Sequence, residues 1–143
     1  MRATNPYILT FLLLGTIACS KTDSTVGPSI SPSPPTMTGR WIVTWTGWYD
    51  GYKGSTAGSM TLTEEDSALS GSISLRNQSF AVAGYLSSAR EVVLTGSDNG
   101  YDYVIFGTVT SSKSTLNGQA YASHTGVVPQ DLVGSATLIA YRH

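Results

Sequence analysis

Apolar and polar residues alternate along the chain from residue 39 to its end. In residues 41–46, for example, one side of the chain carries Trp41, Val43 and Trp45, and the other side carries Ile42 and two threonines. Because successive side chains of a strand point to opposite faces, this period of two predicts β-strands that are buried on one side. The predicted strands cover residues 40–48, 57–64, 68–75, 79–86, 90–96, 101–110, 115–121 and 132–142.

Most of the connections between these strands are short and rich in turn residues. Asn99 and Gly100, for example, supply the positive φ angles that a tight hairpin requires. Short connections join antiparallel neighbours, since a parallel crossover needs about a dozen residues or more. The sequence therefore predicts an all-β domain in which each strand pairs with the next one along the chain.

A glycine repeat runs through the same region. An apolar residue, a spacer and a glycine recur six times, and the glycines are Gly71, Gly84, Gly96, Gly107, Gly118 and Gly134. Glycine weakens a strand, so a regular supply on the inward side marks bends or close packing at barrel corners. Eight strands curved in this way are expected to close into an antiparallel up-and-down barrel, which leaves no sheet edge. The rival arrangement, a β-sandwich, favours longer crossovers than these.

The first nineteen residues have a different composition. A basic start precedes the apolar residues 7–18, which are too few to span a bilayer core that needs about 20. Residues 16–19 (Thr-Ile-Ala-Cys) then resemble the lipobox of bacterial lipoproteins. This resemblance implies a signal peptide over residues 1–18 and a mature N-terminus at Cys19 that carries acyl chains such as palmitate. The alternative is ordinary signal cleavage nearby, which leaves Cys19 as a free thiol or removes it.

The serine at position 20, directly after the cysteine, is similar to the residue that directs bacterial lipoproteins to the outer membrane. The expected location is therefore the bacterial cell envelope, with a lipid anchor in the outer membrane. Residues 19–38 are the lipidated cysteine and a tether rich in Ser, Pro and Thr, which lacks the apolar periodicity needed to offset its ordering entropy. We expect this tether to be disordered and to reach on the order of 50 Å. The barrel domain is assigned to residues 39–143.

Three residues of the barrel domain resemble the signature of the calycins, the superfamily of lipocalins, fatty-acid-binding proteins and avidins. They are Gly39 and Trp41 at the start of the first predicted strand and Arg142 at the end of the last. The resemblance implies that Trp41 closes the base of the barrel and that Arg142 stacks across it. All three are therefore expected to be structural and to touch no ligand.

In a meander, alternate connections lie at the same end of the barrel. The end away from the termini receives the two long connections, residues 47–56 and 122–131, and a group of aromatic residues with polar tips. Such residues on loops above a curved scaffold are typical of a recognition surface. The candidate ligand-binding residues are Trp45, Trp48, Tyr49, Tyr52, Tyr101, Tyr103 and Tyr121.

Composition and charge remove several classes of function. The 143 residues carry a formal net charge of −1, with 12% charged residues, which excludes the basic footprint of a nucleic-acid-binding protein. A single cysteine excludes an intramolecular disulfide and a cysteine-based zinc site. No catalytic, phosphate-binding or nucleotide-binding motif is present. We expect His124 to be a solvated loop residue and residues 64–66 to form a solvated turn.

These observations predict a non-enzymatic lipoprotein without cofactor or metal, whose barrel binds a small apolar or amphipathic ligand at its aromatic end. The alternative is a protein-interaction or hydrolase-inhibitor module, in which the same loops grip an envelope protein and the barrel core is solid. The choice depends on the barrel interior. Small inward residues such as Gly84 and Ala120 favour an open interior, whereas the burial that a cavity forfeits favours a packed one.

Overall fold

The computed structural model describes residues 33–49, 52–76, 78–126 and 132–143, and the side chains of Tyr49 and Tyr52 are not among the described ones. The predicted signal peptide, Cys19 and most of the predicted tether lie outside these residues. Eight strands follow one another: β1 (Gly39–Tyr49), β2 (Tyr52–Glu65), β3 (Ala68–Leu75), β4 (Gln78–Leu86), β5 (Glu91–Asp98), β6 (Tyr101–Val109), β7 (Thr115–His124) and β8 (Leu132–Arg142). In the described part of the chain, no helix is long and apolar enough to cross a membrane.

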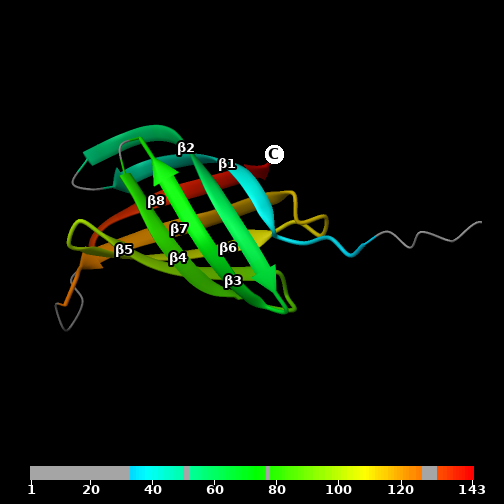
Figure 1. Cartoon of the computed structure of the whole chain (residues 1–143). Helices are drawn as coiled ribbons and strands as arrows, with labels where there is room; N and C mark the ends of the chain where they lie inside the picture. Colours follow the sequence, from blue (N-terminus) through cyan, green and yellow to red (C-terminus); the bar gives the residue numbers. More distant parts are fainter. Residues whose placement is uncertain (1–32, 50–51, 77, 127–131) are drawn as a thin grey trace, which may run out of the picture. The chain divides into compact units, whose positions relative to one another are not determined.

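The strands form a closed antiparallel barrel in chain order (Figure 1). Each strand pairs with the next, and β8 pairs with β1 in a register that joins Trp41 to Arg142 and Gly47 to Ala136. Because every strand has a partner on both sides, the sheet has no free edge. The predicted all-β fold, an eight-stranded up-and-down barrel, is confirmed, and a two-sheet sandwich is excluded.

The prediction of a long connection over residues 47–56 is wrong. β1 continues to Tyr49 and β2 starts at Tyr52, and these two residues pair with each other, so only two residues separate the strands. Glycine, serine and threonine dominate this stretch and interrupt the apolar alternation, although their main chains still pair across the β1–β2 ladder. β7 likewise runs three residues beyond its predicted end, to His124, which shortens the second predicted loop.

Side chains fill the interior of the barrel. Along most of each strand, alternate residues point inward, as in β4, where Phe80 and Val82 are buried and their neighbours are exposed. The largest inward side chains, Trp41, Trp45 and Tyr103, are 0–1% exposed, so no water-sized space lies against them. The barrel interior is therefore a packed hydrophobic core, which is one of the two alternatives that the sequence left open.

The repeated glycines allow neighbouring strands to approach closely. A Cβ atom on Gly71 would fall on the carbonyl oxygen of Thr61, and one on Gly84 would fall on the carbonyl oxygen of Val93. Neither obstacle is a movable side chain, so a larger residue requires a shift of the backbone. The glycines thus fix the local spacing between strands.

The segment just before β1 closes the base of the barrel. Met37 is fully buried in the core, its backbone N–H donates to Glu64 Oε2 (2.6 Å), and its carbonyl oxygen accepts from Trp41 Nε1 (3.0 Å). The guanidinium of Arg142 donates to the carbonyl oxygen of Thr36 (2.7 Å). Trp41 and Arg142 therefore both lie at the base of the barrel and hold Thr36 and Met37 in place, whereas the stacking of Arg142 across Trp41 stays what the calycin resemblance implies. The last three residues of the predicted tether, Thr36–Thr38, are part of the folded barrel.

Glu64 is not the solvated turn residue that the sequence predicts. Its side chain is 11% exposed, and it accepts hydrogen bonds from the Met37 amide and from Lys113 Nζ (2.6 Å). Burial raises the pKa of Glu64, but the hydrogen bonds from Lys113 and Met37 outweigh it, so the pKa lies below its ordinary value of 4.5. We call Thr36, Met37, Glu64, Lys113 and Arg142 the base clasp.

Replacing Glu64 with glutamine is expected to reduce the free energy of unfolding by about 1–2 kcal/mol at pH 7, because hydrogen bonds to a charged group are the stronger ones. The folded-state pKa is lowered, so this contribution is complete above pH 4.5 and disappears as the pH falls through the folded-state value. Urea denaturation at pH 7 and pH 3 should show the two proteins converging in acid. Glu65→Gln, at the exposed neighbouring position, is the control. A difference of the same size at both pH values would contradict the ionic role of Glu64.

Candidate functional site

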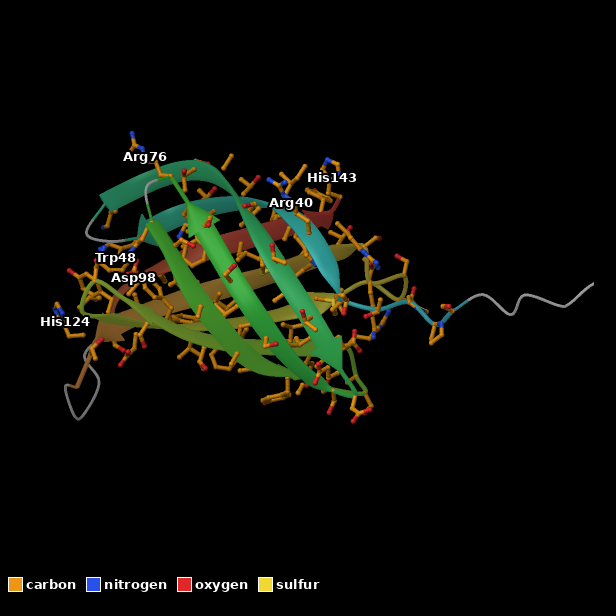
Figure 2. The ribbon with its side chains drawn as sticks, viewed as in Figure 1. Arg40, Trp48, Arg76, Asp98, His124 and His143 are labelled. Atoms are coloured by element: carbon orange, nitrogen blue, oxygen red, sulfur yellow. The ribbon has the colours of Figure 1, made fainter. Side chains whose placement is uncertain are left out.

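The two ends of the barrel carry different side chains (Figure 2). Trp48, Asp98 and His124 lie together at one end, and Arg40 and His143 lie toward the other. The first end is the predicted aromatic end, where β1 meets β2, β5 meets β6 and β7 leads toward β8. The base clasp occupies the opposite end.

Trp48 turns into the barrel because the strand alternation breaks at Gly47. Trp45 and Trp48 are both buried although they are three residues apart, and Gly47 between them has a φ of +134°. The indole ring of Trp48 lies on Gly134, where an added Cβ would collide with the ring. Trp45 Nε1 donates to the carbonyl oxygen of Trp48 at 3.1 Å. Two glycines thus position the side chain that covers the aromatic end.

Six rings pack against one another at this end and form what we call the aromatic cap: Trp45, Trp48, Phe80, Tyr101, Tyr103 and His124. Trp48 meets Tyr101 edge to face, with centroids 4.9 Å apart, and Phe80 stacks on Tyr103 at 4.8 Å. His124 is exposed as expected, but it ends strand β7 instead of lying in a loop, and its ring stacks on Tyr101 at 5.1 Å. Edge-to-face and offset contacts of this kind add to the stability of a core. The aromatic cap therefore closes the barrel rather than leaving an entrance.

The predicted contact residues separate into three groups. Trp45, Tyr103 and Trp48 are at most 8% exposed, and Tyr101 is half-buried, all within the aromatic cap. Tyr121 faces the outer surface of the wall, where its hydroxyl donates to Gln119 Oε1 (2.6 Å), so it is not part of the aromatic cap. The side chains of Tyr49 and Tyr52 are not among those that the structure describes. Their binding roles stay predictions.

The buried side chain of Gln78 lies two residues before Phe80 of the aromatic cap. Gln78 is the first residue of β4 and is 9% exposed, and neither Nε2 nor Oε1 of its amide has a hydrogen-bond partner among the described residues. An unsatisfied buried amide costs about 1–3 kcal/mol. Bound water or a polar group of a ligand usually satisfies such a group.

An open groove of about 1000 Å³ lies on the outer wall of the barrel. It extends over β4 to β8 and is lined by Tyr85, Glu91, Val92, Val93, Phe106, Gly107, Thr108, Asn117, Gly118, Gln119, Tyr121, Thr137 and Ile139. Gly107 and Gly118 pair directly, and their main chains form part of its floor. We call this feature the outer groove.

The strand register arranges the side chains of the outer groove in rows. One row crosses five strands, and its members in order are Tyr85, Val93, Phe106, Gln119 and Thr137. A second row contains Glu91, Thr108, Asn117 and Ile139. Directly opposite residues lie about 4.5–5.5 Å apart, so these side chains form one continuous surface.

The outer groove is nearly uncharged and partly apolar. Tyr85 and Phe106 are 53% and 51% exposed, and both belong to the same cross-strand row. Of the described residues that line the groove, Glu91 is the one with a formal charge, and Ser87 Oγ donates to its carboxylate at 3.4 Å. Exposed apolar surface edged by polar groups is typical of a binding site.

The described residues do not form a ligand set for a metal ion. No group of three or more His, Cys, Asp and Glu side chains is close enough there to hold an ion. Asp102, the acidic residue nearest the aromatic end of β6, accepts hydrogen bonds from Ser97 Oγ (2.6 Å) and Thr125 Oγ1 (3.1 Å). Its carboxylate therefore helps to hold the β5–β6 hairpin.

Comparison with models of known protein families and with curated protein sequences gives no match for this chain. The function of the protein is therefore argued from its fold and from the side chains of the site.

The sequence interpretation missed the outer groove. Its signal was present as large apolar residues in the outward phase of their strands, namely Tyr85, Val93 and Phe106. They are distant in sequence and meet only when β4, β5 and β6 pair in the observed register. One exposed apolar residue on a strand is ordinary, whereas Tyr85 and Phe106, with the half-buried Val93 between them, form a surface.

Proposed function

We propose that the protein is an exported lipoprotein of the bacterial cell envelope, anchored in the outer membrane through acylated Cys19. Its barrel is a non-catalytic binding module that takes its partner on the outer wall. A barrel with a solid core has no room for a ligand inside it, so its partner has to bind on the outside. The lipobox-like residues 16–19 support the anchor.

The packed interior of the barrel is the observation that supports a binding site on its outside. Trp41, Trp45 and Tyr103 leave no space for a molecule inside the barrel, and burying a ligand there would require displacing part of the core. The outer groove, by contrast, offers about 1000 Å³ without any rearrangement. Pre-formed concave sites are the usual location of bound ligands.

A second candidate is the binding of a small apolar or amphipathic ligand at the aromatic end. The buried amide of Gln78 favours it, because both polar atoms lack a partner among the described residues. In this case Trp48 has to swing away from Gly134 and open the aromatic cap. Loss of that packing is the cost that the ligand must offset.

Native mass spectrometry of the full chain, extracted gently from its own envelope, tests the proposal. We expect the mass of residues 19–143 plus acyl chains, with no apolar metabolite retained. The Cys19→Ser variant should lose the acyl mass and leave the membrane fraction. Retention of a discrete apolar metabolite would contradict external binding and support the second candidate. A Cys19→Ser variant that stays in the membrane would contradict the anchor.

A further inference from the structure

We infer that the outer groove binds a linear, neutral glycan; this inference rests on the proposed function and names the ligand class of its external site. The groove combines two kinds of side chain that such a ligand needs. Tyr85 and Phe106 present exposed rings, and Asn117 and Gln119 present amides within the same surface. A sugar ring has an apolar face of C–H groups and a rim of hydroxyls, so it matches both.

The aromatic rings supply the apolar half of the contact. Tyr85 and Phe106 are separated by Val93 in one cross-strand row, so their rings lie two strands apart on the same wall. Phe106 also meets Tyr121 edge to face at 6.2 Å, which supports its ring from the side. Rings that are held but still exposed can pack flat against the C–H face of a sugar.

The polar side chains supply donors and acceptors for hydroxyl groups. Gln119 Oε1 accepts a hydrogen bond from Tyr121, which orients the amide and leaves its two N–H groups to donate. Asn117 and Thr108 lie opposite each other in the neighbouring row. An acyl chain would bury these groups without partners, which costs about 1–3 kcal/mol for each. A polyhydroxylated ligand satisfies them.

The charge of the groove selects against acidic glycans. Glu91 is negative, and no lysine or arginine is among the lining residues that the structure describes. An anionic ligand would meet repulsion there and no counter-charge. A neutral ligand can instead donate a hydroxyl hydrogen bond to the Glu91 carboxylate, which is one of the stronger kinds of hydrogen bond.

The shape of the groove favours a chain of sugars over a single one. The row from Tyr85 to Thr137 crosses four gaps between strands, or roughly 19 Å at the usual strand spacing. The groove is open, so a longer chain can continue past both ends of the row. The predicted ligand therefore lies across the strands of β4 to β8.

Retardation in native gels that contain a soluble neutral polysaccharide tests this inference, with the full chain in mild detergent. The probes are a β-glucan, a xylan and a galactomannan in separate gels, and a polyuronate is the charged comparison. We expect at least one neutral polymer to retard the protein and the polyuronate not to. Titration calorimetry with a hexasaccharide of that polymer then measures the affinity.

Substitution of the aromatic row locates the site. Phe106→Ala should weaken binding at least tenfold, and Gln119→Ala by a few fold. Ile42→Ala is the matched control, because Ile42 is an apolar strand residue with a similar exposure (49%) outside the groove, and it should bind as the parent does. Unchanged far-ultraviolet circular dichroism of each variant establishes that it is folded.

The possible outcomes separate this inference from the proposed function. The inference of a glycan ligand is overturned if no neutral polymer retards the protein. It is also overturned if Phe106→Ala and the parent are retarded equally. If Phe106→Ala instead abolishes capture of a defined envelope protein, the outer groove is still the binding site and its ligand is a protein. Retention of an apolar metabolite inside the barrel would overturn the external site itself.

Discussion

Replacing Gly84 with alanine is expected to destabilise the barrel by about 3 kcal/mol, although it adds a single methyl group. The new Cβ would fall on the carbonyl oxygen of Val93 in the adjacent strand β5. Because the obstacle is backbone, relief requires β4 and β5 to separate where Gly84 pairs with Leu94, deep in the core. Core residues on both strands would then lose contacts.

Urea denaturation of the parent and of Gly84→Ala measures this effect as a change of midpoint at constant slope. Ala83→Ser is the matched control, since Ala83 is the preceding residue and faces outward, and it should change stability by less than about 0.5 kcal/mol. A midpoint for Gly84→Ala within the error of the parent would show that the two strands can move apart at little cost.

Replacing Met37 with alanine is expected to cost about 3 kcal/mol, as much as a substitution in the centre of the barrel. Met37 lies before the first strand, yet it is fully buried within the hydrophobic core. The substitution keeps both backbone hydrogen bonds of the residue, to Glu64 and from Trp41, so the loss is that of the buried side chain alone. The cavity that remains would open the base of the barrel.

The same denaturation experiment compares Met37→Ala with two further variants. Met37→Leu conserves volume and should cost less than about 1.5 kcal/mol. Pro34→Ala, at an exposed position three residues earlier, should leave the midpoint unchanged within about 0.5 kcal/mol. Equal stability of Met37→Ala and Pro34→Ala would mean that the segment before β1 does not hold the barrel closed.

The barrel itself could be predicted because its signals are local. Alternation places Trp41, Val43 and Trp45 on one face from the sequence alone, and short turns specify antiparallel neighbours. The extension of β1 and β2 could not be predicted in the same way. Their outer halves pair through the main chain, and glycine and serine there carry no apolar signal.

The base clasp shows a different limit of sequence interpretation. Met37 is a single apolar residue among proline, serine and threonine, and one residue has no period. Its burial depends on partners far along the chain: Glu64 at the end of β2, Lys113 after β6 and Arg142 at the end of β8. These groups meet only after the barrel closes, so no local pattern could have identified them.

The candidate site was anticipated in part. The sequence gathers aromatic residues at one end, and the structure unites several of them in the aromatic cap, where they pack against each other. What the sequence could not distinguish is an aromatic residue that binds from one that seals. Trp48 seals because Gly47 and Gly134 allow its ring to fold inward, a relation between two strands.

The base clasp also determines how the barrel would respond to mechanical load. A pull on the chain ahead of residue 33 acts first on Thr36 and Met37, whose hydrogen bonds connect to β1, β2 and β8. Tension is thereby shared among three strands and does not peel β1 from its neighbour one hydrogen bond at a time. A barrel pulled from its N-terminal side is therefore expected to keep the shape of its wall under load.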